Sequence, residues 1–300
     1  MPSLKVKTKG VIALVALSFV YSIVALIPRY LSASFELFQQ IYLRVFLGFI
    51  FATIFFRKNI NFNKIITSPL KDLGLIFLRA TSYYLLGVAL WTQALLLTKI
   101  SNVALIGAIP MTAILGWIIL KERFTWQKAS LVLLAFLGTL IISIKKLTMT
   151  GNFVLGKGEL LIFASTFFLA LGKISRKWES KRLNDKEASV VLLFFSALLL
   201  FLASLFKGEG LPIINWHLGT LLVLVIAGLS NVAIAFLVSY GFARVKAVLA
   251  NNIIQLDIPL SILLAFIFYQ ELPVFRELIG GGIIVTSVIL MNRLEKKSPL

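Results

Sequence analysis

Long, uninterrupted apolar runs are the feature that most constrains this chain. Many of them reach or approach about 20 residues, the length that a helix needs to cross ~30 Å of hydrocarbon. Hydrophobic residues make up 59% of the 300 residues and charged residues only 14%, whereas a soluble domain is nearer to half apolar and about a quarter charged. Transmembrane β-barrels instead need short segments that alternate at period two. The sequence therefore predicts an all-α, polytopic membrane protein.

The apolar runs between charged or Pro- and Gly-rich breaks predict ten transmembrane helices. Their approximate spans are residues 10–28, 36–56, 72–97, 101–120, 126–144, 158–174, 187–206, 218–242, 248–269 and 274–292. The first run is longer than the apolar core of a usual signal peptide, so we expect a retained first helix. The joints at 98–100 and 270–273 are very short, and we expect the helices on either side of each joint to form an antiparallel hairpin.

Basic residues outnumber acidic ones and decide the expected orientation. The chain has 30 Lys and Arg against 12 Asp and Glu, a net charge of +18. If the N-terminus is cytoplasmic, 21 basic residues fall in or beside inner segments and seven in outer ones, as the positive-inside rule requires. We therefore expect both termini inside and a position in the cytoplasmic (inner) membrane of a prokaryote. Because the basic residues flank apolar runs and do not form one exposed face, no nucleic-acid partner is expected.

One apolar segment occurs twice in the chain. Residues 109–122 read IPMTAILGWIILKE and residues 258–271 read IPLSILLAFIFYQE. The copies fall on the fourth and ninth predicted helices, and because they are an odd number of spans apart they run through the bilayer in opposite directions. The pattern predicts two inverted five-helix repeats, residues 1–150 and 151–300. Inverted repeats are typical of secondary carriers, which bind substrate near the midplane where the halves meet.

Both copies lie in longer segments with a recognisable pattern. The stretches ALLLTKISNVALIGAIPMTAILGWIILKERFTW, residues 94–126, and GFARVKAVLANNIIQLDIPLSILLAFIFYQELPVF, residues 241–275, resemble the two EamA repeats of the drug/metabolite transporter superfamily. That family places a proline early in the fourth helix of each repeat and a glutamate at its end; the matching residues here are Pro110 with Glu122 and Pro259 with Glu271. The resemblance implies a five-plus-five inverted topology and carrier-type movement of small metabolites.

The resemblance is uneven in the first two helices. Arg44 in the second helix resembles an arginine that family members often carry there. In the first helix they often have a Trp-Gly pair, whereas this chain reads LSFVYSIVALIP at residues 17–28. That helix commonly lines the cavity in the family, so the resemblance implies no particular substrate.

Three charged residues lie well inside predicted spans, where each costs at least about 2.5–3.5 kcal/mol and usually faces a cavity or a partner. Arg44 and Asp257 come from opposite halves at similar depth. They either form an ion pair that locks the halves together or bind substrate. In the second case the planar guanidinium holds a carboxylate or phosphate, and Asp257 binds an amine or takes up a proton. Arg79 lies nearer the inner side, where its side chain reaches the headgroups, so a structural role is favoured over substrate binding.

Polar residues collect before the second proline. Asn251 and Gln255 are i, i+4 neighbours and share one helix face. Pro259 frees a carbonyl one turn earlier, and this carbonyl together with the adjacent acid suits a cationic or hydrogen-bonding ligand. Before Pro110 in the first copy the counterpart is milder, with Asn102 as the polar candidate. We expect helix breaks at both prolines.

The third helix offers an aromatic face. Its candidates for a cavity wall with a hydrogen-bonding edge are Tyr83, Tyr84, Trp91 and Gln93. Aromatic residues are also common anchors at membrane interfaces, and the sequence leaves both roles open.

Composition disfavours several other kinds of site. With no cysteine and one histidine, His217, the chain offers no ligand set for a metal and no sign of a cofactor. No P-loop occurs, so direct use of ATP by this chain is not expected. The three glycines at 280–282 lie in an apolar run and indicate close helix packing.

These observations predict a secondary active transporter that moves a small polar metabolite by alternating access, with proton coupling through Asp257 as one option. The expected substrate is an amino-acid derivative or a nucleoside-like compound, and the expected partners are this molecule and the lipid bilayer. An exporter of lipophilic cations is an alternative that fits Asp257 but not Arg44. A membrane enzyme is a weaker alternative, because the histidine is single and the acids are scattered. The direction of transport, the coupling ion and the oligomeric state stay open.

Overall fold

The structure, a computed structural model, describes residues 4–120, 125–147, 153–180, 182–213, 217–245, 250 and 253–297. The first part of the chain forms α1 (Leu4–Val24), α2 (Ile27–Leu31), α3 (Leu37–Phe56), η1 (Arg57–Asn59), α4 (Phe62–Ile66), α5 (Leu70–Ala80), η2 (Thr81–Val88), α6 (Ala89–Leu97), α7 (Ile100–Gly107), α8 (Met111–Leu120) and α9 (Trp126–Ser143). The second part forms β1 (Ile144–Leu147), β2 (Phe153–Leu155), α10 (Lys157–Ser175), α11 (Asp185–Phe206), α12 (Leu218–Arg244), α14 (Asp257–Tyr269) and α15 (Phe275–Lys297).

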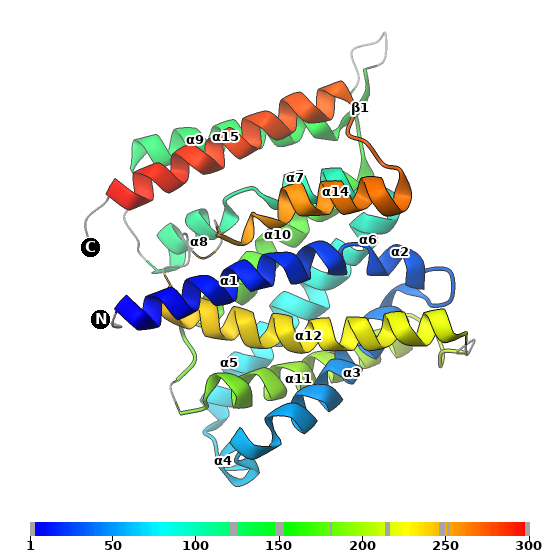
Figure 1. Cartoon of the computed structure of the whole chain (residues 1–300), viewed down its shortest axis with the longest axis vertical. Coiled ribbons are helices and arrows are strands. Elements are labelled where there is room, and N and C mark those ends of the chain that lie inside the picture. The colour runs from blue at the N-terminus through cyan, green and yellow to red at the C-terminus, as the bar shows by residue number, and fades with distance from the viewer. Residues whose placement is uncertain are drawn as a thin grey trace.

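Helices long and apolar enough to cross a membrane dominate the described residues. Six such stretches are Thr8–Leu31, Leu37–Asn59, Leu70–Leu97, Lys157–Ser175, Asp185–Phe206 and Leu218–Arg244, and shorter apolar helices cover Trp126–Ile142 and Asp257–Tyr269. Most helices lie side by side, with the start of α1 and the end of α15 at one end of the molecule and α2 and β1 at the other (Figure 1). A polytopic helical membrane protein is thus confirmed, and the count of ten spans stays a prediction.

A short hairpin follows α9, in the joint that the predicted spans left between residues 144 and 158. β1 and β2 pair antiparallel, with Ile144 opposite Leu155 and Leu147 opposite Phe153. β2 contains Phe153 and Val154, residue types that favour extended strands, and it pairs with the short strand β1 directly after α9 ends. The hairpin is a small addition to an otherwise helical fold, and the sequence did not predict it.

The two copies of the repeated segment are both interrupted, in different ways. The predicted helix 101–120 is split, because α7 ends at Gly107 and α8 starts at Met111. Pro110 lies between them; a proline has no N–H for the helix and disfavours helical geometry in the residue before it. In the second copy the turn is at Gln255 and Leu256, ahead of α14, and Pro259 is the third residue of that helix. A proline is tolerated there because the first turn leaves its N–H groups unpaired.

The third predicted helix is continuous but not uniform. α5, η2 and α6 run together from Leu70 to Leu97, and the middle section, η2, is π-helical over eight residues. π-helical segments are rare in proteins, and those that occur often lie at functional sites. Tyr83 and Tyr84 lie in η2 and are buried, a placement that the apolar pattern of this helix does not reveal.

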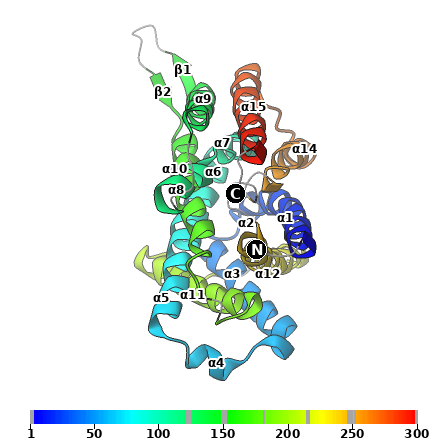
Figure 2. The ribbon, with the colours of Figure 1, turned by 90° about the vertical axis from the view of Figure 1, so that its left-hand side faces the viewer.

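The helices form two facing layers, with α5, α8, α9 and α10 in one and α1, α12, α14 and α15 in the other (Figure 2). α1 packs on α12 and α14, which lie in the second half of the chain, whereas α10 packs on η2, α6 and α8, which lie in the first. Each predicted half therefore contributes its first helix to the layer built mainly by the other half. Any space between the layers is lined by both halves.

The pair α9 and α15 closes one edge of these layers (Figure 1). A Cβ placed on Gly138 would lie 2.7 Å from the carbonyl oxygen of Gly280, and one placed on Gly280 would lie 2.6 Å from the carbonyl oxygen of Gly138. These two glycines allow the helix backbones to approach more closely than any side chain would permit.

Candidate functional site

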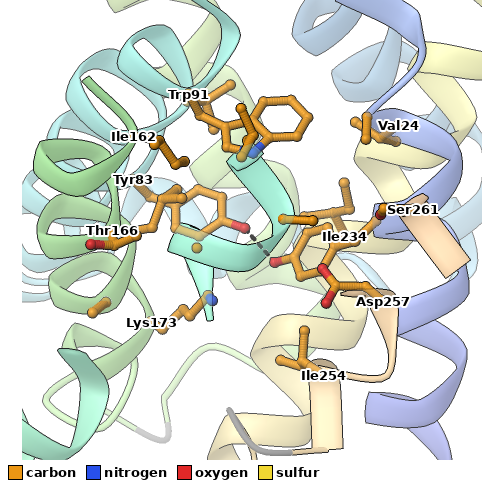
Figure 3. Close-up of a pocket in the computed structure, with 18 of the residues that line it drawn as sticks. Val24, Tyr83, Trp91, Ile162, Thr166, Lys173, Ile234, Ile254, Asp257 and Ser261 are labelled. Atoms are coloured by element: carbon orange, nitrogen blue, oxygen red, sulfur yellow. Dashed lines mark hydrogen bonds between the residues drawn. The ribbon is translucent and has the colours of Figure 1, made fainter. Parts of the chain in front are cut away.

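A cavity lies between the two layers, with about 1210 Å³ of space when its open mouth is counted. One wall comes from η2, α6, α8 and α10, and the facing wall from α1, α12 and α14. Residues of α3 and α7 complete the lining. Figure 3 shows Tyr83, Thr166 and Lys173 on one side and Asp257 and Ser261 on the other. Ligand sites are typically concave, mostly apolar and supplied with a few polar groups, and this cavity has those properties.

Tyrosines from both layers meet inside the cavity. The hydroxyl groups of Tyr21 and Tyr83 are hydrogen-bonded at 2.5 Å (Figure 3), and the Tyr83 and Tyr84 rings meet edge to face with centroids 5.1 Å apart. Close approach of α10 fixes this wall, because a Cβ on Gly172 would lie 2.6 Å from the Tyr83 Cβ. Trp91 lines the same cavity from α6. The result is an aromatic wall with hydroxyl groups along it.

Arg44 is a buried cation in the cavity wall. It lies on α3 and is 3% exposed. Its Nε donates to the carbonyl oxygen of Gln40 at 3.0 Å, and one terminal nitrogen donates to the Thr92 hydroxyl at 3.3 Å. No ion pair joins it to an acid within the part of the chain that the structure describes. A guanidinium has five N–H donors, so donors remain for an anion in the cavity.

Asp257 enters the cavity from the opposite wall. It is the first residue of α14 and is half-buried. Lys173 on α10 faces the cavity from the other layer (Figure 3), and the two charges interact electrostatically. The Lys173 ammonium also lies 5.8 Å from the centroid of the Tyr21 ring. One corner of the cavity therefore combines a carboxylate, a ring face and a resident cation.

A hydrogen bond joins the two interrupted helices. The Gln255 side-chain amide donates to the carbonyl oxygen of Ala108 at 2.7 Å. Both residues lie where the backbone leaves the helix, so carbonyl groups that a helix would have used accept from a side chain instead. The two copies of the repeat thus meet at their breaks, and both Gln255 and Ala108 line the cavity.

Comparison with known proteins agrees with this architecture. The sequence profile described as the EamA-like transporter family matches residues 8–144 and again residues 156–293. The chain belongs to the EamA-like transporter family. The resemblance of the two long segments to EamA repeats is confirmed, and the family indicates a transporter and not an enzyme.

Relatives of this EamA-like transporter carry transporter names. The S-adenosylmethionine uptake transporter of Rickettsia bellii (strain RML369-C) is 25% identical, covering 90% of this chain and 88% of the relative. The protein of the same name from Rickettsia prowazekii (strain Madrid E) is 25% identical, covering 92% of this chain and 90% of the relative. An uncharacterized transporter of Haemophilus influenzae (strain ATCC 51907 / DSM 11121 / KW20 / Rd) is 25% identical, covering 90% of this chain and 93% of the relative. A solved structure matches with a TM-score of 0.66 at 16% identity, over 96% of this chain and 99% of that chain, which supports a shared fold.

The cavity of this EamA-like transporter contains most of the candidate residues that the sequence suggested. Six of them line it: Arg44, Tyr83, Tyr84, Trp91, Gln255 and Asp257. The ion pair considered between Arg44 and Asp257 is not formed among the described residues, because Arg44 bonds to neutral groups. Asn251 lies outside the described residues.

Three other candidates lie away from the cavity. Arg79 is 1% exposed and pairs with Glu179 at 3.1 Å. Asn102 donates to Glu159 at 3.0 Å and lines a second pocket together with Arg29 of α2. Gln93 is exposed, because its position on α6 points away from the neighbouring helices. The predicted substrate-contact role finds no support from these positions.

Two residues at the charged corner, Lys173 and Tyr21, were not predicted from the sequence. Lys173 ends an apolar run and is followed closely by Arg176 and Lys177, so it resembles an ordinary flanking charge. Tyr21 resembles one more aromatic residue in an apolar helix. The small residue Gly172 beside Lys173 was the only local hint of tight packing, and it does not by itself indicate a site.

Ion pairs also hold both ends of this EamA-like transporter. At the end where α1 starts, Arg79 pairs with Glu179 at 3.1 Å, and Arg176 and Arg244 each bond to Asp185 at 2.7 Å. These contacts connect α5, α11 and α12 with the segment that follows α10.

At the end that holds α2, Arg29 pairs with Glu271 and Lys99 pairs with Glu277 at 3.1 Å. Glu271 also accepts from the backbone N–H of Ile100 at 2.9 Å. These contacts connect α2, the joint between α6 and α7, the joint between α14 and α15, and the first turn of α15. The cavity thus lies between two separate clusters of ion pairs.

Proposed function

We propose that this chain is a secondary transporter that carries S-adenosylmethionine, or a closely related zwitterionic nucleoside, across the cytoplasmic membrane of a prokaryote. S-adenosylmethionine has a carboxylate, an ammonium group, a sulfonium centre and a purine. The cavity offers the buried guanidinium of Arg44, the carboxylate of Asp257 and an aromatic wall. The proposal rests above all on Arg44, a buried cation that donates to a carbonyl and a hydroxyl group among the described residues.

Arg44 is the group to which we assign the substrate carboxylate. Burying a charge without a partner is costly, and a carboxylate ligand would supply the missing partner. Hydrogen bonds between a guanidinium and a carboxylate are about twice as strong as neutral ones and are frequently bidentate. The substrate amine or sulfonium would then face Asp257, and the purine would pack on the rings of Tyr83, Tyr84 and Trp91.

Alternating access between two inverted halves is the proposed mechanism. In this scheme residues 1–150 and 151–300 form the halves, ten spans cross the membrane and both termini are cytoplasmic. The two clusters of ion pairs would act as gates on opposite sides of the cavity. One cluster would open while the other stays closed, as carriers built from inverted repeats require.

Uptake into proteoliposomes tests the proposed substrate. Purified protein should accumulate radiolabelled S-adenosylmethionine, and unlabelled compound should compete with it. Arg44→Lys should raise the half-saturating concentration at least about tenfold, because an ammonium cannot reproduce the bidentate fork. Arg57→Lys is the matched control, since Arg57 directly follows α3 and is exposed. Absence of saturable uptake by the unaltered protein would refute the proposed substrate.

Proton coupling is the finer part of the proposal and is assigned to Asp257. This residue is the acid among the lining residues, so a proton and a substrate cation would compete for it. Asp257→Asn should abolish uptake driven by a pH gradient while the protein keeps its fold. Normal pH-driven uptake by that variant would remove Asp257 from coupling.

Export of lipophilic cations is the second candidate, and Asp257 in a largely apolar cavity is the observation that favours it. The buried charge of Arg44 disfavours it, because a like charge repels such substrates. Competition distinguishes the two candidates. Inhibition by lipophilic cations but not by zwitterions would favour the exporter.

A further inference from the structure

The corner of the cavity around Asp257 already holds a cation. Lys173, on α10, interacts electrostatically with Asp257 on α14, and its ammonium lies 5.8 Å from the centre of the Tyr21 ring on α1. Both charged residues are half-buried and line the cavity (Figure 3). A cation within about 6 Å of an aromatic face is attracted by the ring. The corner therefore has the two elements that attract a positive charge, a carboxylate and a ring.

Tyr21 is held in position for this role. Its hydroxyl is hydrogen-bonded to that of Tyr83 at 2.5 Å, so the ring spans from one layer to the other with its polar end occupied. Its ring face is the part that meets a cation, which is Lys173 in this structure. Because the partner Tyr83 lies in the π-helical segment η2, the corner is built by α1, η2, α10 and α14 together.

Two cations do not fit into one such corner. Like charges at about 4 Å repel by about 1 kcal/mol in water and by about 4 kcal/mol at the effective dielectric constant typical near a protein surface. A cationic substrate that reaches Asp257 must therefore move the Lys173 ammonium away. A lysine on a flexible four-carbon stem makes this movement through rotations of its own side chain.

We propose that this corner is a cation subsite which Lys173 fills in the empty carrier, and that a cationic centre of the substrate replaces Lys173 beside Asp257 and Tyr21. The inference rests on the proposed function and extends it, because it restricts substrates to compounds with a positive centre. Asp257 then has a positive charge near it in both the empty and the loaded protein. The carrier has no need to reorient with a bare carboxylate in the membrane, which would be costly.

Removal of the resident cation tests the inference. The affinity of purified Lys173→Met for S-adenosylmethionine, measured by equilibrium binding in detergent, should be about tenfold higher than that of the unaltered protein, since about 1.4 kcal/mol of repulsion is relieved. Lys173→Arg keeps the charge and should bind no more tightly than the unaltered protein. Lys157→Met removes the same charge from an exposed position on the same helix and serves as the matched control.

A second ligand identifies which cationic centre occupies the subsite. S-adenosylhomocysteine, the demethylated thioether, lacks the sulfonium but keeps the ammonium group. If the sulfonium enters the subsite, Lys173→Met strengthens binding of S-adenosylmethionine alone. If the ammonium enters, binding of both compounds is strengthened. Either result supports a cation subsite.

The opposite result overturns the inference. If Lys173 itself holds the substrate carboxylate, Lys173→Met weakens binding, and an unchanged affinity likewise means that Lys173 does not compete. Lys173→Gln, which keeps a polar side chain, repeats the test if the methionine variant does not fold. Failure of the unaltered protein to bind S-adenosylmethionine would instead refute the proposed function, so the two failures are distinguishable.

Discussion

Arg44 and Arg79 are two buried arginines with opposite surroundings. Both lie on helices of the first half and are 3% and 1% exposed. Arg79 pairs with Glu179 at 3.1 Å and donates to the Ser239 hydroxyl at 3.2 Å. Arg44 bonds to a carbonyl and a threonine hydroxyl and lines the cavity. Burial alone therefore does not tell whether a charged residue stabilises the fold or binds a ligand. The presence of an acidic partner in the protein makes the distinction.

The reason for the difference is visible in the fold. The π-helical segment η2 separates the Arg79 environment from the one that Arg44 shares with Thr92 on α6. Arg79, just before η2, reaches the segment after α10, where acids are present. The bonds of Arg44 to Gln40 and Thr92 use only part of its N–H donors, and the others remain for a ligand in the cavity. The comparison predicts that loss of an acid matters for folding at one arginine, and that loss of the cation matters for ligand binding at the other.

The largest expected effect is on stability at the Arg79 site. Glu179→Gln leaves a nearly fully buried guanidinium without its acid, and removal of one partner of a buried ion pair typically costs about 3–5 kcal/mol. The free energy of unfolding in detergent should fall by that order. The double variant Arg79→Met/Glu179→Gln should recover part of the loss, because the buried Arg79 charge is removed together with its acid, and Arg176, the other partner of Glu179, keeps Asp185. Unchanged stability of Glu179→Gln would show that Arg79 does not depend on this pair.

Arg44→Met should show the reverse pattern. Its affinity for S-adenosylmethionine should fall by about 30- to 100-fold, which corresponds to about 2–3 kcal/mol for a lost hydrogen bond to a charged group. Its stability should stay the same or rise, because a buried charge without an acid partner is replaced by an apolar side chain. A loss of several kcal/mol in unfolding free energy with normal binding would make Arg44 a structural residue like Arg79.

A smaller effect is expected where the two interrupted helices meet. Gln255→Leu removes the hydrogen bond to the Ala108 carbonyl and should lower the unfolding free energy by about 0.5–1.5 kcal/mol. Gln93→Leu, at an exposed position, is the matched control. Thermal unfolding of both variants in the same detergent gives the comparison. Equal midpoints would mean that the bond across the breaks contributes nothing to stability.

Much of the fold follows from the sequence, because apolar runs of membrane length can form few structures other than transmembrane helices. The helix boundaries agree with the predicted spans within a few residues for α9, α10, α11 and α12. The repeated Ile-Pro segments also located the breaks near which Asp257 and Gln255 lie. The hairpin after α9 was missed because a run of a few residues is too short to show a period.

The site was harder to predict because it depends on contacts between distant segments. Arg44 and Arg79 look alike in sequence, and only packing shows that one of them meets an acid. Lys173 lies beside other basic residues, and its turn toward Asp257 follows from how α10 packs between helices of the first half. The exchange of α1 and α10 between the layers has no local sequence signal.

Protection of introduced cysteines tests the central claim, that substrate binds between the two copies of the repeat. The chain has no cysteine, so Thr112→Cys and Ser261→Cys would each carry a single thiol at matched positions of the two copies, both in the cavity wall. S-adenosylmethionine should slow the reaction of both thiols with a small thiol reagent, and should leave Ser32→Cys, at an exposed position, unaffected. Binding of the compound without protection of either cavity thiol would contradict the account.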